Sequence, residues 1–305
     1  MFWIVFGVAF SVAGLVTLAV VVFGHYGFSL FVLIPAVAGF ASAWMCNMGR
    51  EWAWRRTIAT VSLTLATTGF LMLGLEGAVC ILMASGLAGI LAFLGAAIAW
   101  LVSKLAPNQN KVLFLVCLLC PLTMGFEQRF RKQPPLLEQS TEIVIDAPPD
   151  VVWSFVPAFP RIDTAPGGLL GAGLAYPVVS TIQGEGVGAR RSCVLSTGEM
   201  PEVITRWEPG SALELDVLAT PPVMVEMNPL LDVHPPHVEG YFTVKRGRFL
   251  LVPLSDGRTR VEGTSWFRHD LWPQFYWAPI TRGIVKQVHE RVLEHIKQLS
   301  EQAAQ

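Results

Sequence analysis

The stretch that decides the expected fold is residues 259–301, TRVEGTSWFRHDLWPQFYWAPITRGIVKQVHERVLEHIKQLSE. Its first part alternates between two sides, as a half-buried strand does, with one side formed by Val261, Gly263, Ser265 and Phe267. Its second part changes to a helical period, with an apolar stripe formed by Ile280, Ile284, Val288, Val292, Ile296 and Leu299. We expect this long terminal helix to lie on a sheet and to close it over an apolar cavity.

The region before this stretch predicts the sheet. Strands are expected at residues 177–183, 189–196, 202–207, 212–218 and 241–254. Asp256-Gly257 predicts a hairpin turn into the strand that begins at Thr259. Upstream, Ile143 and Ile145 alternate in a short strand, and Pro148-Pro149 suits the first turn of a helix. This order predicts an α+β layer of antiparallel strands with the helices on one face.

Composition divides the chain into two unlike parts. The chain is 52% hydrophobic and only 15% charged, and its first 125 residues hold just five basic and two acidic side chains. We therefore expect a helical membrane domain at 1–126, a linker at 127–140 and a globular domain at 141–305. Neither part has the basic excess of a nucleic-acid-binding protein.

Five apolar segments could each cross a bilayer, which needs about 20 apolar residues per helix. They are residues 2–23, 28–46, 57–75, 78–102 and 112–126, of which the last is shorter and contains Pro121. Loops rich in Lys and Arg after the second and fourth segments favour a cytoplasmic N-terminus, and five spans then place the globular domain outside. Arg129, Arg131 and Lys132 oppose this orientation, and a re-entrant fifth segment would leave the globular domain in the cytoplasm.

Polar and small residues of the apolar part have ordinary interpretations. Glu76 suits a membrane interface, and Cys117 and Cys120 suit apolar packing better than redox or metal chemistry. Small residues recur at four-residue steps, which lets helices approach closely, either partner helices or others of the same chain. They are Ala84, Ala88, Ala92 and Ala96.

Several motifs together resemble the START-like or polyketide-cyclase-like (SRPBCC) superfamily, over about residues 140–302. They are IDAPPDVVW (145–153), GEGVGARRSCVLSTG (184–198), VITRWEPGSALELDV (203–217), GRTRVEGTSWFRHDL (257–271) and the terminal helix. The resemblance implies a helix-grip fold, in which a curved antiparallel sheet wraps a long C-terminal helix, and a cavity that holds an apolar ligand. An HPPH stretch at 234–237 and PQFYW at 273–277 are similar to uncharacterised membrane-tethered members.

Charged residues on neighbouring predicted strands are the candidates for chemistry. Glu202 with Arg191 or Arg206 could orient a polar head group or transfer a proton, whereas outward-facing side chains would form only a surface ion pair. We take Glu202, Arg206 and His269 as the candidate catalytic residues. The predicted ligand-binding residues are Arg191, Glu202, Trp207, His237, Tyr241, Trp266 and Tyr276.

The loop at 220–239 carries histidines, carboxylates and apolar residues. His234 and His237 lack a third ligand at a known spacing, so we assign no metal ligand and no cofactor. The loop could act as a lid, could touch the bilayer, or could simply pack.

Three functions remain open. The first is a membrane-anchored module in the inner or plasma membrane that binds or transfers a hydrophobic, lipid-like molecule. The second is a cyclase or dehydrase acting on an apolar substrate. The third is an accessory or structural subunit that contacts other membrane proteins. We favour binding over catalysis, because no Ser-His-Asp set, HExxH motif or phosphate loop is present.

Overall fold

The computed structural model describes residues 2–22, 26–47, 54–105, 109–130, 133–229 and 234–305. These residues form two compact units. The first unit comprises Met1–Gln133, Glu226–Pro236 and Leu271–Tyr276. The second comprises Pro134–Val225, His237–Asp270 and Trp277–Gln305. The basic loop expected after the second apolar segment lies mostly outside the described residues, as do residues 230–233 of the loop at 220–239.

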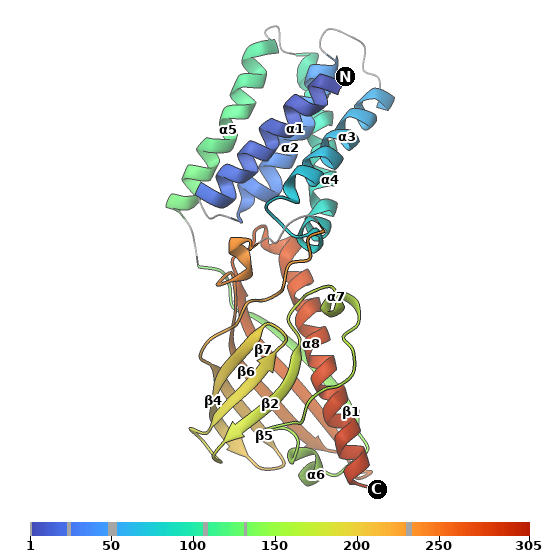
Figure 1. Ribbon diagram of the computed structural model, residues 1–305, viewed down its shortest axis with the longest axis vertical. Helices are drawn as coiled ribbons and strands as arrows, with labels where there is room; N and C mark the ends of the chain where they lie inside the picture. The colour runs from blue at the N-terminus through green and yellow to red at the C-terminus, as the bar shows by residue number, and fades with distance from the viewer. Residues whose placement is uncertain (1, 23–25, 48–53, 106–108, 131–132, 230–233) are drawn as a thin grey trace. The chain divides into compact units, whose positions relative to one another are not determined.

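The first unit is helical, and each predicted apolar segment forms a helix (Figure 1). Its elements are α1 (Phe2–Thr17) with the π-helical turn η1 (Leu18–Val22), the π-helical turn η2 (Ser29–Leu33) with α2 (Ile34–Asn47), α3 (Trp54–Met72), α4 (Ala78–Ser103) and α5 (Gln109–Arg129). Glu127 of α5 accepts hydrogen bonds from the backbone amides of Phe28, at 2.6 Å, and Ser29, at 3.0 Å. A carboxylate here stabilises the positive end of the helix that begins at η2.

Within the described part of the chain, α4 alone is long and apolar enough to cross a membrane. Helices α3 and α5 have 19 and 21 residues, but they include more polar side chains than α4 does. The expectation of five spans is therefore not supported by these helices, because length alone does not make a segment apolar enough to enter a bilayer.

Small residues hold α2 against α4. A Cβ atom added to Gly39 would overlap the backbone of Ala92, and one added to Gly95 would overlap the backbone of Ala36. Such close approach needs glycine at both crossings. Ala92 and Ala96 are buried at this contact. Part of the predicted small-residue face therefore serves packing within the unit rather than docking of a partner.

The second unit is a single antiparallel sheet of seven strands in the order β1-β7-β6-β5-β4-β3-β2 (Figure 1). The strands are β1 (Leu137–Ile145), β2 (Pro177–Gln183), β3 (Arg190–Leu195), β4 (Gly198–Glu208), β5 (Ala212–Val217), β6 (Phe242–Pro253) and β7 (Thr259–His269). Short helices α6 (Pro149–Trp153), α7 (Gly168–Gly171) and the 3₁₀ turn η3 (Pro236–Val238) lie in the connections. Strand β1 begins inside the stretch expected as a linker.

The hairpin between β6 and β7 forms where the sequence predicts it. Pro253 pairs with Thr259, and the intervening Gly257 has φ = +84°, a conformation that glycine adopts without steric cost. The backbone amide of Leu254 donates to the carbonyl of Arg258 at 2.8 Å. Each side of the hairpin then continues as a long strand of the curved sheet.

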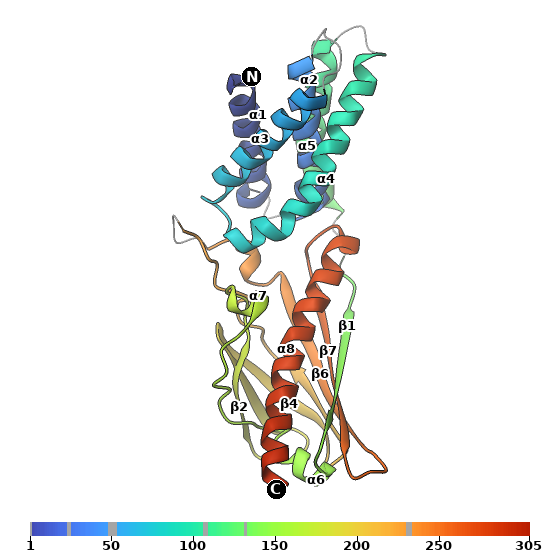
Figure 2. The same ribbon diagram turned by 90° about the vertical axis from the view of Figure 1, so that its right-hand side faces the viewer.

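Helix α8 (Gln274–Ala303) lies along the concave face of the sheet, which we call the inner face (Figure 2). This arrangement confirms the predicted helix-grip fold. The buried side of α8 differs from the predicted stripe, since it includes polar positions and contains only Val292 and Ile296 of the stripe. Its members are Trp277, Thr281, Val285, Val292, Leu293, Ile296 and Ser300. Leu293 of α8 packs directly over Gly263 of β7, since a Cβ atom added to this glycine would lie in van der Waals contact, at 3.7 Å, with the leucine side chain.

Apolar side chains from the sheet, α6 and α8 form one core on the inner face. Its buried members include Ile145, Val152, Phe159, Ile204, Leu213, Leu215, Val261, Leu293 and Ile296. Burying each such side chain stabilises the fold by about 1.5–3 kcal/mol. The cavity that the sequence predicts on this face stays a prediction.

A β-bulge interrupts β4. Ile204 pairs with Leu215, but the next pairing joins Arg206 to Glu214, so Thr205 is an extra residue. An extra residue reverses the alternation beyond it. Glu202 and Ile204 therefore face inward before the bulge, and Trp207 faces inward after it.

Candidate functional site

The inner face of the sheet holds a buried ion pair. Arg191 of β3 and Glu202 of β4 are directly opposite in the register, and they are 5% and 3% exposed. The Arg191 guanidinium donates through Nη1 to the Glu202 carboxylate and through Nε to the carbonyl of Pro157, at 2.7 Å. Phe159 lies 5.9 Å from the guanidinium. The predicted association of Arg191 with Glu202 is thus formed.

Burial changes the chemistry of this pair. Loss of solvent raises the pKa of Glu202 above its usual range, although the neighbouring guanidinium of Arg191 acts in the opposite direction. Desolvation of both charges opposes the formation of such a buried ion pair, and removal of one partner destabilises the fold further because it leaves a buried charge without a counter-ion. Its place on the inner face, beside apolar side chains, makes it the strongest candidate for recognising a polar group of a ligand.

Two small polar side chains lie next to the pair, and the sequence analysis did not single them out. Cys193 follows Arg191 on the same face of β3, and burial raises the pKa of its thiol to about 12. Ser180 of β2 pairs with Cys193 in the register and is 2% exposed, and its hydroxyl makes no hydrogen bond within the described residues. Strand alternation with Arg191 is the signal that could have identified Cys193.

Arg206 lies on the opposite face of the sheet from Glu202. Its guanidinium donates to Glu208 at 2.8 Å and to Glu214 at 3.2 Å, and all three side chains contact solvent. The bulge at Thr205 is the physical reason, because it turns Arg206 outward. The idea that Arg206 and Glu202 act together on the inner face is therefore wrong.

The two predicted tryptophans have different surroundings. Trp207 packs edge-on against Trp153 of α6, with ring centroids 5.4 Å apart, at the margin of the core. Trp266 lies on the outer face of the sheet, where its Nε1 donates to Glu138 at 3.0 Å and Arg246 covers its ring at 4.2 Å. Trp266 is thus not part of the inner face, because it alternates with the inward-facing Phe267.

The remaining predicted residues do not gather at the ion pair. His269 is buried at the end of β7, and strands β5 and β6 separate it from the strand of Glu202. His237 is buried in η3, and the Tyr241 carbonyl accepts a hydrogen bond from the amide of Asp270. Tyr276 belongs to the first unit, where its hydroxyl donates to the carbonyl of Met83 in α4. The catalytic role predicted for His269 and the ligand-binding roles predicted for His237, Tyr241 and Tyr276 stay predictions.

A polar contact between α8 and the sheet was not predicted. His289 lies within hydrogen-bond distance of Ser265 on β7, at 2.8 Å, and of Thr141 on β1, at 3.2 Å. Burial lowers the pKa of His289 to about 4, so the imidazole is neutral at physiological pH. The apolar stripe of the helix gives no sign of this contact, because His289 is polar and its partners lie on distant strands.

A groove of about 290 Å³ lies on the other side of α8. It is formed by the segment around Gly167 and Leu170 and by polar helix residues that include Arg291 and His295. Arg291 is already engaged, since it donates to the carbonyls of Pro177 at 3.0 Å and Thr164 at 2.8 Å. These hydrogen bonds fasten the segment to the helix.

Comparisons with known proteins agree with this architecture. Residues 137–301, just over half of the chain, match the family model described as polyketide cyclase / dehydrase and lipid transport. The matched region begins at the first residue of β1 and ends within α8. No curated protein matches the chain.

Solved structures resemble the chain at low identity. A protein from Nitrosospira multiformis has 20% identity over 53% of this chain and 94% of its own, with a TM-score of 0.31. A protein from Mesorhizobium loti has 17% identity over 54% and 98%, with a TM-score of 0.34. Truncated norcoclaurine synthase from Thalictrum flavum has 12% identity over 53% and 94%, with a TM-score of 0.32. No function follows from similarities of this size.

Proposed function

Because the chain belongs to the polyketide cyclase/dehydrase and lipid transport family, we propose that its second unit binds a hydrophobic small molecule on the inner face of the sheet. The observation that carries this proposal is the Arg191–Glu202 pair, which is buried on a face made mostly of apolar side chains. Ligand sites are mostly apolar and contain a few placed polar groups. In the proposed complex, the pair contacts the polar end of the molecule and the apolar wall contacts the rest.

The first unit holds the chain in a lipid bilayer in this proposal. Support comes from α4 and from large apolar side chains that point out of the helices. Examples with more than half of the residue exposed are Trp3, Phe10, Phe70, Leu82, Ile90 and Leu122. Monomeric soluble proteins rarely expose so much apolar surface in one region. A bilayer would cover these side chains and would also be a source of hydrophobic ligand.

The test compares two glutamates on neighbouring strands. Full-length protein in mild detergent is examined by native mass spectrometry after exposure to a lipid extract. We expect a hydrophobic molecule in the wild type and about tenfold weaker retention in Glu202→Gln, because a hydrogen bond to a charged group contributes about 1.5–3 kcal/mol. Glu214→Gln, on the outer face, is the matched control and should retain the molecule as the wild type does.

Two results would overturn the proposal. One is a wild-type protein that retains no hydrophobic molecule of any class, and the other is equal retention by the Glu202→Gln and Glu214→Gln variants. Thermal unfolding followed by circular dichroism checks that each variant is folded. If Glu202→Gln does not fold, Arg191→Lys serves instead, because lysine keeps the positive charge but lacks the planar guanidinium group with its several hydrogen-bond donors.

A second candidate function is cyclisation or dehydration of an apolar substrate with Glu202 as the acid. The raised pKa of Glu202 supports it, because buried carboxyl groups that keep their proton can donate it to a substrate. Arg206 faces outward, so it is not available to act with Glu202 on a substrate at the inner face. Under this candidate, Glu202→Gln would abolish turnover of the retained molecule and leave its binding intact.

A further inference from the structure

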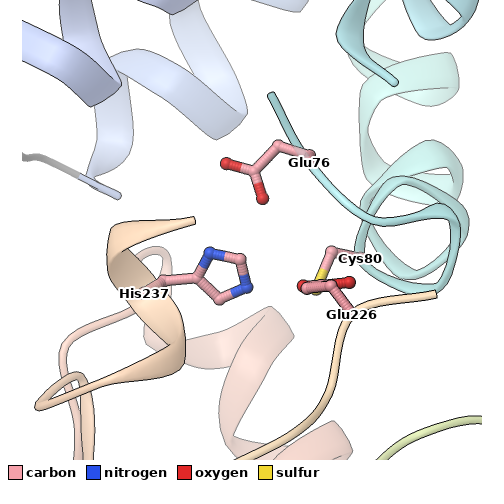
Figure 3. Close-up of side chains that lie close together, drawn as sticks. All are labelled: Glu76, Cys80, Glu226 and His237. Carbon is pink, nitrogen blue, oxygen red and sulfur yellow. The ribbon is translucent and has the colours of Figure 1, made fainter. Parts of the chain in front are cut away.

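The turn before α4 gathers three potential metal ligands from two distant parts of the first unit (Figure 3). Glu76 precedes α4, Cys80 lies in its first turn, and Glu226 comes from the segment Glu226–Pro236 of the same unit. One oxygen of each carboxylate and the sulfur of Cys80 all lie within 4.8 Å of one another. His237, also drawn in Figure 3, belongs to the second unit and is not counted in this cluster.

Hydrogen bonds join the turn before α4 to the segment that begins at Glu226. The amide of Ala78 donates to the carbonyl of Met227 at 2.9 Å. The Asn228 side chain donates to the carbonyl of Leu73 and, at 3.3 Å, to that of Glu76. Residues about 150 positions apart in the chain are thus fixed in register, so the approach of Glu226 to α4 does not depend on its own side chain.

A glycine makes room for the Glu226 carboxylate. The Cys80 thiol donates to Glu226 Oε1 at 3.0 Å, and a Cβ atom added to Gly77 would overlap the same carboxylate group. Gly77 has φ = −76°, which any residue can adopt, so its backbone does not require glycine. The space above Gly77 is therefore what lets the carboxylate reach the cluster.

The Glu76 carboxylate is oriented from outside the cluster. The hydroxyl of Tyr26 donates to Glu76 Oε1 at 2.5 Å, and Glu76 is only 8% exposed. Ligating carboxylates in metal sites typically carry such an outer hydrogen bond. The carboxylates of Glu76 and the half-buried Glu226 also repel each other at this separation, and a divalent cation between them removes that repulsion.

We propose that Glu76, Cys80 and Glu226 bind one divalent cation of the zinc class. A thiolate with two carboxylates suits Zn²⁺ or Co²⁺, whereas Mg²⁺ and Ca²⁺ take oxygen ligands only. Binding releases the thiol proton to solvent, and the cation then joins Glu226 to the start of α4. The fourth position of a tetrahedral site is open to water or another donor.

The experiment uses full-length protein in mild detergent, stripped with a chelator and then incubated with Zn²⁺ or Co²⁺. We expect about one ion per chain and, with Co²⁺, the charge-transfer absorption of a thiolate ligand. Cys80→Ser should remove this absorption and weaken binding at least about tenfold. Cys120→Ser is the matched control, because Cys120 is another cysteine of this unit and is buried among apolar side chains.

A second pair of variants changes no ligand. Gly77→Ala should push the Glu226 carboxylate away and weaken Zn²⁺ binding, whereas Gly89→Ala, in open space on α4, should not. Tyr26→Phe should weaken binding about 10-fold, the usual effect of losing an outer hydrogen bond. A wild type that takes up no more Zn²⁺ than Cys80→Ser, or a Co²⁺ form without thiolate absorption, overturns the proposal and leaves the cluster as a hydrogen-bonded latch.

Discussion

The two faces of the sheet carry the same kinds of charged side chains in opposite environments. On the inner face, Arg191 and Glu202 pair with almost no exposed surface. On the outer face, Arg206 pairs with Glu208 and Glu214 in contact with solvent. Burial raises the pKa of Glu202, whereas hydrogen bonding to Arg206 lowers the pKa of Glu208. The difference teaches that the side of the strand, rather than the residue type, sets the electrostatic cost of a charge.

The strongest test of this comparison is to remove one member of the Arg191–Glu202 pair. Arg191→Met leaves the Glu202 carboxylate buried without its counter-ion, and we expect a loss of about 3–5 kcal/mol in the free energy of unfolding. Urea denaturation of the full-length protein measures it. The double variant Arg191→Met/Glu202→Leu should regain most of this loss, because an apolar pair of similar volume is often neutral or stabilising. A single variant as stable as the wild type would contradict the comparison.

The next effect concerns His289, whose partners Ser265 and Thr141 also lie on the inner face. Its folded pKa of about 4 is below the unfolded value of about 6.5, so its contribution is complete above the unfolded pKa and is lost as pH falls toward 4. A shift of this size corresponds to about 3 kcal/mol.

Unfolding free energies of the wild type and His289→Gln, measured between pH 7 and pH 4, check this prediction. The wild type should lose stability over that interval, and His289→Gln should lose less, because glutamine does not titrate. Parallel curves for the two proteins would mean that another group accounts for the acid sensitivity.

The smallest effect is expected on the outer face. Arg206→Ala removes two solvent-exposed ion pairs, and such pairs contribute little because water screens them. The midpoint of thermal unfolding should match that of the wild type within measurement error. A clear decrease would show that the outer pairs form a network that stabilises the sheet, and it would weaken the contrast between the faces.

Most of the helix-grip fold could be predicted because strand alternation, helical periodicity and turn residues all indicate the same elements along this part of the chain. Strand β2 has the predicted bounds, and the Asp256-Gly257 turn forms as expected. The buried face of α8 was less predictable, because polar residues such as Thr281 and His289 face the sheet there. Apolar periodicity cannot detect a polar side chain that finds its partner only in the folded protein.

The candidate site was predicted in part, for a related reason. Arg191 and Glu202 are correctly associated, since both precede the bulge in their pairing. Arg206 was assigned to the wrong face, because a β-bulge leaves no reliable pattern in a single sequence. The association of Glu226 with Cys80 depends on contacts between residues 146 positions apart, which no local spacing reveals.

The single extra residue in β4 has a consequence for how this fold could change. Deleting Thr205 would leave the faces unchanged, because Arg206 would still pair with Glu214 on the outer face and Trp207 with Leu213 on the inner face. Straightening the bulge with Thr205 kept would instead pair Thr205 with Glu214, so Arg206 would turn toward α8 and Trp207 toward water. A guanidinium would then replace an indole along the inner wall, and a small change in pairing would give this fold a differently charged interior.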